Sequence, residues 1–117
     1  MENKNTVDAI QATSAKMRRH IIEMGFTAGG RGAHFGPALS SVEIVSSLFF
    51  GVMTHNPENP RMPERDRFVL SKGHACMVYY AALVEAGYIT EEEMYTFKQD
   101  ESFLSGHPSL NMDHGIE

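Results

Sequence analysis

Six histidines occur in the 117 residues, and three of them share one local setting. His34 lies in Gly-Ala-His-Phe-Gly, His74 in Lys-Gly-His-Ala and His107 in Ser-Gly-His-Pro. Each follows a small residue at an expected element boundary, where a side chain can project into a cleft while the backbone stays close-packed. Imidazole can donate or accept a proton near neutral pH. Three such groups in one pocket would suit a reaction in which hydroxyls gain and lose protons.

Each histidine also has a simpler explanation. A single histidine beside a small residue more often has a structural than a catalytic role, and the repeated setting shifts that balance without deciding it. Zinc binding is disfavoured, because no carboxylate or closely spaced pair of ligands accompanies the three. The single cysteine, Cys76, cannot form an internal disulfide. His20 falls within the first predicted helix, where we expect a surface or interface residue.

The segment Ser71–His74 is a candidate anion site. It leads from a predicted strand into a predicted helix, so its backbone N–H groups and the helix dipole could receive a diphosphate. It is shorter than a Walker loop and lacks the Gly-Lys-Ser/Thr ending, so its spacing alone is a weak signal.

Two helices are predicted in the first half of the chain. Apolar residues recur at helical spacing from Thr6 to about Met24, and this helix is expected to end at Gly25 or soon after. The glycine-rich stretch Gly29–Pro37 predicts a loop. Ser40 and Glu43 form a capping-box pattern that predicts the start of a second, largely apolar helix.

Two further helices and one strand are predicted in the second half. A helix follows His74 and is expected to stop at Gly87, and a shorter helix starts at the Thr90–Glu93 capping box and runs to about Gln99. Phe68–Leu70 is typical of a short buried strand of a parallel sheet. One strand cannot form a sheet, so its neighbours must come from beyond Glu117 or from another polypeptide. The predicted fold class is α/β, helix-rich, with an incomplete sheet.

The composition excludes several classes of function. Ten Lys and Arg stand against 15 Asp and Glu, for a formal net charge of -5, and this lacks the basic footprint of a protein that binds nucleic acid or an anionic membrane. No stretch approaches the roughly 20 apolar residues of a membrane span. With one cysteine and no secretory signal pattern, we expect a cytoplasmic protein.

The order of the motifs is more specific than any one of them. A histidine beside glycines, the helix from Ser40, the proline-rich connection after Asn56, the Asp66–Ala75 run and Gly106-His107-Pro108 together resemble the N-terminal region of transketolases. The similarity extends from about Ala12 to Glu117. It implies that residues 1–117 are an incomplete N-terminal portion of a diphosphate-binding domain with a parallel sheet and flanking helices.

The resemblance also implies a chemistry. Transketolases transfer a two-carbon ketol unit between sugar phosphates with thiamine diphosphate and a divalent cation, Mg²⁺. By similarity, His34 and His107 face the hydroxyls of the sugar, while His74 lies against the diphosphate. The thiazolium ring of the cofactor accepts the carbanion that carbon–carbon cleavage leaves.

Two departures from the family pattern matter. The family usually has Ser-Gly-His-Pro-Gly at the first histidine, whereas Phe35 follows His34 here. This variant is similar to split, two-subunit transketolases, some of which act on modified sugars. The 117 residues also stop before the metal-binding Gly-Asp-Gly motif and the glutamate of a later domain. We therefore expect the chain to be inactive alone and to need a complementary chain or C-terminal subunit in an oligomer.

Two alternatives stay open. The chain could be a non-catalytic interaction module, a shortened copy that keeps the helices packing against a partner. It could also be a fragment of another thiamine-diphosphate enzyme, such as a deoxyxylulose-phosphate synthase or a dehydrogenase component. The presence of both Lys72–Ala75 and Ser105–Pro108 favours a transketolase over these enzymes.

Overall fold

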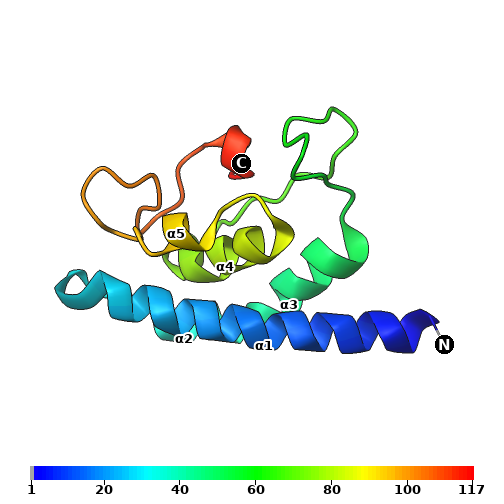
Figure 1. The fold of residues 1–117 in the computed structure, drawn as a ribbon, viewed down its shortest axis with the longest axis horizontal. Helices are drawn as coiled ribbons and strands as arrows, with labels where there is room; N and C mark the ends of the chain where they lie inside the picture. The colour runs from blue at the N-terminus through cyan, green and yellow to red at the C-terminus, as the bar shows by residue number, and fades with distance from the viewer. Residues whose placement is uncertain (1) are drawn as a thin grey trace.

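A long helix, α1 (Glu2–Ala28), runs along one side of the molecule (Figure 1). The structure is a computed structural model that describes residues 2–117. After α1 the chain turns through a 3-10 turn, η1 (Gly29–Arg31), and returns beside α1 as two short helices, α2 (Phe35–Ser40) and α3 (Val42–Ser47). The first half of the chain is therefore a helical hairpin that forms the base of the molecule.

The second half of the chain lies on this base. Helix α4 (Cys76–Ala86) packs on α1 and is preceded directly by the 3-10 turn η3 (Gly73–Ala75). Helix α5 (Glu91–Met94), the 3-10 turn η4 (Met112–His114) and the loops complete the outer layer (Figure 1). None of the helices within residues 2–117 combines the length and the apolar character needed to cross a bilayer.

Helix α1 is longer than the predicted Thr6–Met24. Four of its residues are buried at spacings of four and three, Met17, Ile21, Met24 and Ala28, and α1 packs on α4, α3 and α2. The helix ends at Ala28, three residues after Gly25, in agreement with the predicted end at Gly25 or soon after. A glycine inside a helix costs only about 0.5–1 kcal/mol relative to alanine, so packing on α4 decides where the helix ends.

The predicted start of the second helix at Ser40 is wrong. Ser40 is the last residue of α2, and its hydroxyl donates to the carbonyl of Pro37 at 3.1 Å rather than capping a helix. Ser41 stands at the N-cap of α3 without a side-chain capping bond. The helix itself is confirmed: it continues from α3 into a π-helical turn, Leu48–Val52, and buries three of its apolar residues, Val42, Val45 and Phe49.

Phe68–Leu70, the predicted strand, forms no ladder within residues 2–117. Among residues 2–117 the only β pairing is an isolated antiparallel bridge between Asn111 and Ile116. Phe68 packs on Tyr79 with ring centroids 4.8 Å apart, whereas Val69 is 70% exposed. A strand needs a hydrogen-bonded neighbour, and no segment of residues 2–117 pairs with Phe68–Leu70. The regular elements of the described residues are therefore all helical.

Helix α4 is the centre of the core, and eight consecutive residues, from Cys76 to Leu83, are buried. It ends where predicted, with Gly87 in the left-handed conformation at φ 95°. The capping box between Thr90 and Glu93 is also confirmed. The last predicted helix is shorter than expected, however, because α5 ends at Met94 instead of near Gln99.

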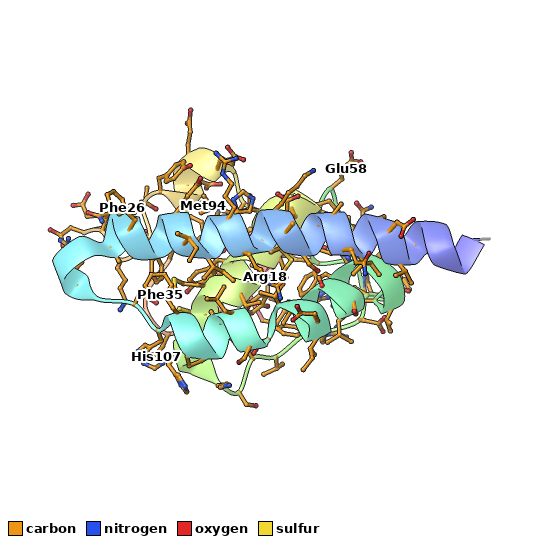
Figure 2. All side chains as sticks on the ribbon, turned by 90° about the horizontal axis from the view of Figure 1, so that it is seen from below. Arg18, Phe26, Phe35, Glu58, Met94 and His107 are labelled. Atoms are coloured by element: carbon orange, nitrogen blue, oxygen red, sulfur yellow. The ribbon has the colours of Figure 1, made fainter. Side chains whose placement is uncertain are left out.

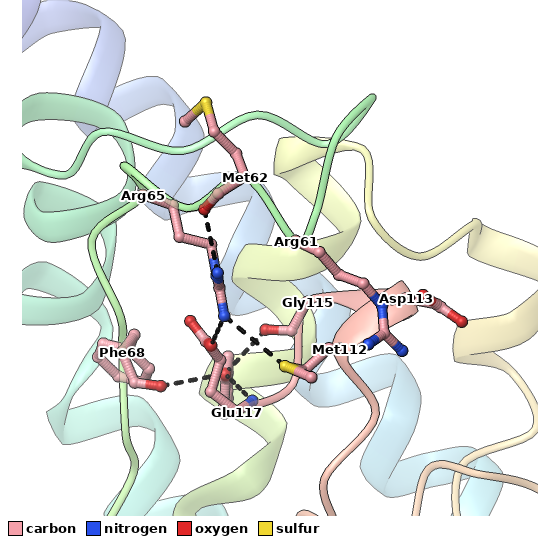
Figure 3. A network of polar contacts seen from close by, with 9 residues as sticks. Arg61, Met62, Arg65, Phe68, Met112, Asp113, Gly115 and Glu117 are labelled. Carbon is pink, nitrogen blue, oxygen red and sulfur yellow. Dashed lines mark hydrogen bonds and ion pairs between the residues drawn. The ribbon is translucent and has the colours of Figure 1, made fainter.

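A largely buried ion pair between Arg65 and Glu117 joins the connection before Phe68–Leu70 to the C-terminal loop (Figure 3). Arg65 donates to Glu117 Oε1 at 2.5 Å and to the carbonyl of Met62 at 3.0 Å. The Tyr79 hydroxyl, from α4, donates to the carbonyl of Gly115 at 2.9 Å and accepts from the amide of Glu117 at 3.1 Å. These bonds hold both segments against α4.

Candidate active site

The structure brings His34 and His74 together. His34 occupies the N-cap position of α2, and His74 lies in η3 at the start of the α4 run. Their ring centroids are 5.4 Å apart with the planes at 78°, an edge-to-face contact. His34 is exposed and His74 is partly buried, so the two imidazoles line a surface that solvent reaches.

His107 joins the same site across Gly73. A Cβ atom on Gly73 would lie 2.8 Å from Nδ1 of His107, so the imidazole occupies the space that a side chain would fill. Since Gly73 precedes His74 directly, His107 stands beside the other two histidines. Figure 2 shows His107 at the N-terminal end of α2, near Phe35. The three histidines that share a sequence setting therefore converge in space.

Helix α4 anchors the loop that carries His107. The hydroxyl of Tyr80 donates to the carbonyl of Ser105 at 2.7 Å, and the thiol of Cys76 donates to the carbonyl of Gly106 at 3.1 Å. The Ser105 hydroxyl donates to the carbonyl of His107 at 2.6 Å. Burial raises the pKa of Cys76 to about 11, so this thiol stays protonated and acts as a donor.

Lys98 is a residue of this region that sequence reasoning missed. Its ammonium donates to the carbonyl of Gly32 at 2.9 Å, and its Cε lies 2.7 Å from the position of a Cβ on Gly106. Lys98 thus touches the segments that lead to His34 and to His107. The sequence places it in the predicted helix 90–99, where a lysine would normally be a solvated charge, so no signal in the sequence marks it.

Phe35 packs toward helix α1. The position of a Cβ on Gly25 would lie 2.0 Å from Cζ of the Phe35 ring. This contact holds the start of α2 against α1 and so fixes the residue that precedes Phe35, which is His34. The ring is still 38% exposed, and the rest of its surface faces solvent near the site.

The expectation that His20 is a surface or interface residue is wrong. Its side chain is 7% exposed, and Nε2 pairs with Glu85 Oε2 at 2.7 Å. Its Nδ1 is buried without a hydrogen-bond partner among the described residues. Helical spacing could have indicated the burial, because His20 stands three residues after Met17 and four before Met24. The pairing residue lies on α4, far along the chain, so the sequence pattern of α1 could not reveal the pair.

His55 and His114 also lie in other surroundings. His55 donates from Nε2 to the carbonyl of Phe49 at 2.6 Å and accepts at Nδ1 from the hydroxyl of Tyr88 at 2.8 Å. His114 stacks on Phe103 with centroids 4.2 Å apart. Both imidazoles contact residues other than the three converging histidines, in agreement with the absence of the shared sequence setting.

The residues around His74 fit one end of a diphosphate cofactor. The turn η3 runs directly into α4, so the positive end of one continuous helical segment lies at Gly73 and His74. Lys72, which is exposed, adds a positive charge there. No group of three His, Cys, Asp or Glu side chains within the described residues is arranged to hold a metal ion, the three converging histidines included. The described side chains thus offer groups for an anion, and no donor set for Mg²⁺ is found among them.

The helical layer is shared with a solved transketolase. The transketolase from Leishmania mexicana superposes with a TM-score of 0.79 at 32% sequence identity, over 92% of this chain and 16% of that one. Residues 10–117 also match the family described as transketolase, thiamine diphosphate binding domain. The chain belongs to this family, which confirms the resemblance found in the sequence.

Individual relatives point to the same family. The chain is 38% identical over 110 residues to one subunit of the apulose-4-phosphate transketolase of Actinobacillus succinogenes, covering 94% of this chain and 40% of that protein. It is 39% identical over 106 residues to human transketolase, covering 91% of this chain and 17% of that protein. The 117 residues therefore span less than half of the length of either relative.

Proposed function

We propose that this chain forms the substrate-facing and diphosphate-facing part of a transketolase, which moves a two-carbon ketol unit between sugars or sugar phosphates. The observation that supports this most strongly is the convergence of His34, His74 and His107 at the start of α4. Family membership supplies the class of reaction, and the convergence supplies a place for it within these residues.

The two exposed histidines are proposed as proton-transfer groups. His34 and His107 reach the site from two different loops, one before α2 and one anchored by Tyr80. In this arrangement each imidazole can exchange a proton with a hydroxyl of the sugar as the carbon–carbon bond is broken or formed. Thiamine diphosphate supplies the electron sink for that bond when it is bound.

His74 is proposed to bind the diphosphate group. It stands at the positive end of the η3–α4 helical segment, with Lys72 two residues before it, and a partly buried imidazole there can donate to a phosphate oxygen. Mg²⁺ would require ligands outside residues 2–117, because the described side chains hold no suitable cluster.

The missing elements are proposed to come from a complementary polypeptide. Two relatives are named as one of the subunits of an apulose-4-phosphate transketolase, which implies that those proteins have a second subunit. We propose that a partner or C-terminal subunit provides the metal motif and the activating glutamate here, in a cytoplasmic oligomer. In that assembly residues 1–117 form part of the diphosphate-binding domain, and Phe68–Leu70 becomes a strand of its parallel sheet.

Phe35 is proposed to influence which sugar the site accepts. Its partly exposed ring follows His34 directly, and one relative is named for a particular sugar phosphate, apulose 4-phosphate. We propose that the sugar taken by this chain is a phosphorylated or modified sugar, with Phe35 forming part of the surface beside it.

Complementation tests the proposal. The chain would be combined with a complementary transketolase polypeptide that carries the metal motif and the glutamate, and both thiamine diphosphate binding and ketol transfer would be measured with Mg²⁺ present. We expect both to appear only when the two polypeptides are mixed. Complex formation without cofactor binding or ketol transfer at any stoichiometry would favour the interaction module instead.

A further inference from the structure

Lys98 bridges the two loops that carry the exposed histidines. Its Nζ donates to the carbonyl of Gly32, two residues before His34. The end of its side chain also lies against Gly106, the residue before His107. A Cβ on that glycine would lie 2.7 Å from Cε of Lys98 and 3.3 Å from its Nζ. One side chain therefore touches the backbone leading to both histidines.

The backbone of Lys98 is held in an unusual conformation that directs this side chain. Its φ of 59° lies in the left-handed region, which non-glycine residues rarely occupy. Its amide donates to the carbonyl of buried Leu104 at 2.9 Å, which closes the turn after α5. Its ammonium lies 5.8 Å from the ring centroid of buried Phe97. A strained backbone fixed by these contacts points to a functional constraint on the side chain.

We propose that Lys98 is a positioning residue of this site, which sets the separation of His34 and His107 by holding their loops together. The inference rests on the function proposed above, because it assigns the two imidazoles to one sugar. Groups that act on the same substrate must keep their geometry to within about 0.5 Å, and an error of about 1 Å can lower a rate by about a hundredfold.

The chemistry of a lysine suits this role. The ammonium supplies the hydrogen bond to Gly32, and the long alkyl stem lies against Gly106, where the missing Cβ leaves room for it. Methionine keeps much of the apolar stem but cannot donate, whereas arginine keeps both the stem and the donors. Comparing Lys98→Met with Lys98→Arg therefore distinguishes the contribution of the hydrogen bond to Gly32 from that of the packing of the stem.

The test uses the enzyme reconstituted from this chain and its complementary polypeptide. Lys98→Met, Lys98→Arg and Lys16→Met would be compared, the last as a control because Lys16 is exposed on α1. For Lys98→Met we expect kcat to fall at least about tenfold, with thiamine diphosphate affinity changed less than about twofold. Lys98→Arg should recover most of kcat, and Lys16→Met should match the unmodified enzyme.

A second measurement does not depend on turnover. With histidine in this chain selectively labelled for NMR, Lys98→Met should shift the imidazole signals of both His34 and His107. The signals of buried His20 and of His55 should stay in place, and Lys98→Arg should return the two shifted signals toward their original positions.

The outcomes separate this inference from the proposed function. If the unmodified pair shows no ketol transfer, the proposed function fails, while the imidazole signals still test whether Lys98 joins the two loops. If the pair is active and Lys98→Met retains kcat, or shifts the signal of only one of the two histidines, Lys98 does not set their separation. A thermal midpoint that falls equally in Lys98→Met and Lys98→Arg, together with kcat, would reduce the role of Lys98 to general stability.

Discussion

The ring of Phe35 occupies the space beside Gly25 that a side chain would need, with Cζ 2.0 Å from the position of a Cβ on that glycine. Helix α1 and the start of α2 approach each other closely because residue 25 has no side chain. His34 precedes Phe35, so this contact between two helices also fixes one of the proposed proton-transfer groups.

Gly25→Ala should therefore destabilise the protein, although alanine favours helix more than glycine does. We expect a loss of about 1–3 kcal/mol from the forced displacement of the ring, partly offset by about 0.5–1 kcal/mol of helix propensity. Urea unfolding followed by circular dichroism would measure it. Gly30→Ala is the matched control, because nothing lies within 4 Å of a Cβ there.

A double substitution checks the cause. Gly25→Ala combined with Phe35→Ala removes the ring that the new methyl group meets. The loss of unfolding free energy in the double variant should therefore be smaller than the sum of the losses in the two single variants. Simple additivity of the two single losses would show that the ring and the glycine are not coupled.

Tyr80→Phe should loosen the loop that carries His107. The variant removes the hydroxyl that donates to the carbonyl of Ser105 at 2.7 Å. Tyr80 is fully buried, with 0% exposure. A loss of about 1–3 kcal/mol in unfolding free energy is expected, as for other buried groups left without a partner. Tyr95→Phe is a suitable comparison, since that hydroxyl bonds Glu23 on an exposed surface, and its loss should stay within about 0.5 kcal/mol.

The capping box of α5 should make stability depend on pH. The hydrogen bond from the backbone N–H of Thr90, with further help from its hydroxyl and from His114, lowers the pKa of Glu93 below its ordinary value of 4.5. A lowered carboxyl pKa contributes stability above about pH 4.5, and that contribution is lost as the pH falls through the folded-state pKa.

Glu93→Gln separates the charge from the cap, because glutamine can still accept the Thr90 bond. The unmodified chain should be more stable than this variant by about 0.5 kcal/mol near pH 7, and the difference should shrink toward zero as the pH falls well below about 4.5. Unfolding curves at several pH values would measure the difference. A constant difference over that range would exclude Glu93 as the titrating group.

The three histidines should differ in the kinetic quantity that they affect. In the reconstituted enzyme, His34→Ala or His107→Ala should lower kcat by about a hundredfold or more, with little change in thiamine diphosphate affinity. His74→Ala should mainly weaken cofactor binding. Steady-state kinetics and cofactor titration would measure both, and equal effects of all three substitutions on affinity would contradict the proposed division of roles.

The parts of the fold that sequence predicts well are set by neighbouring residues. Gly87 ends α4 because a left-handed residue completes that helix terminus, and the Thr90–Glu93 box closes within one turn. Ser40 shows the limit of such patterns. Its spacing to Glu43 also fits a capping box, but the carbonyl of Pro37 in the unforeseen helix α2 takes its hydroxyl.

The candidate site, like the fold, can be predicted from the sequence only in part. The shared setting of His34, His74 and His107 is visible in the sequence, and their convergence agrees with it. The ion pair of His20 and the bridge made by Lys98 depend on partners far along the chain, Glu85 and Gly32, and no local pattern identifies such pairs. The strand predicted at Phe68–Leu70 stays a prediction, because a strand is defined by its neighbour and no segment within residues 2–117 pairs with it.

The packing of α1 on α4 has a consequence for synthesis. Met17, Ile21 and Met24 lie on the buried face of α1, which packs on α4, and the first residue of α4, Cys76, comes roughly fifty residues later. At about 5–20 residues per second, translation takes several seconds to deliver it, and closing so long a loop adds an entropic cost. During that interval the apolar face of α1 is exposed on the ribosome, where a chaperone that binds apolar helices would find it.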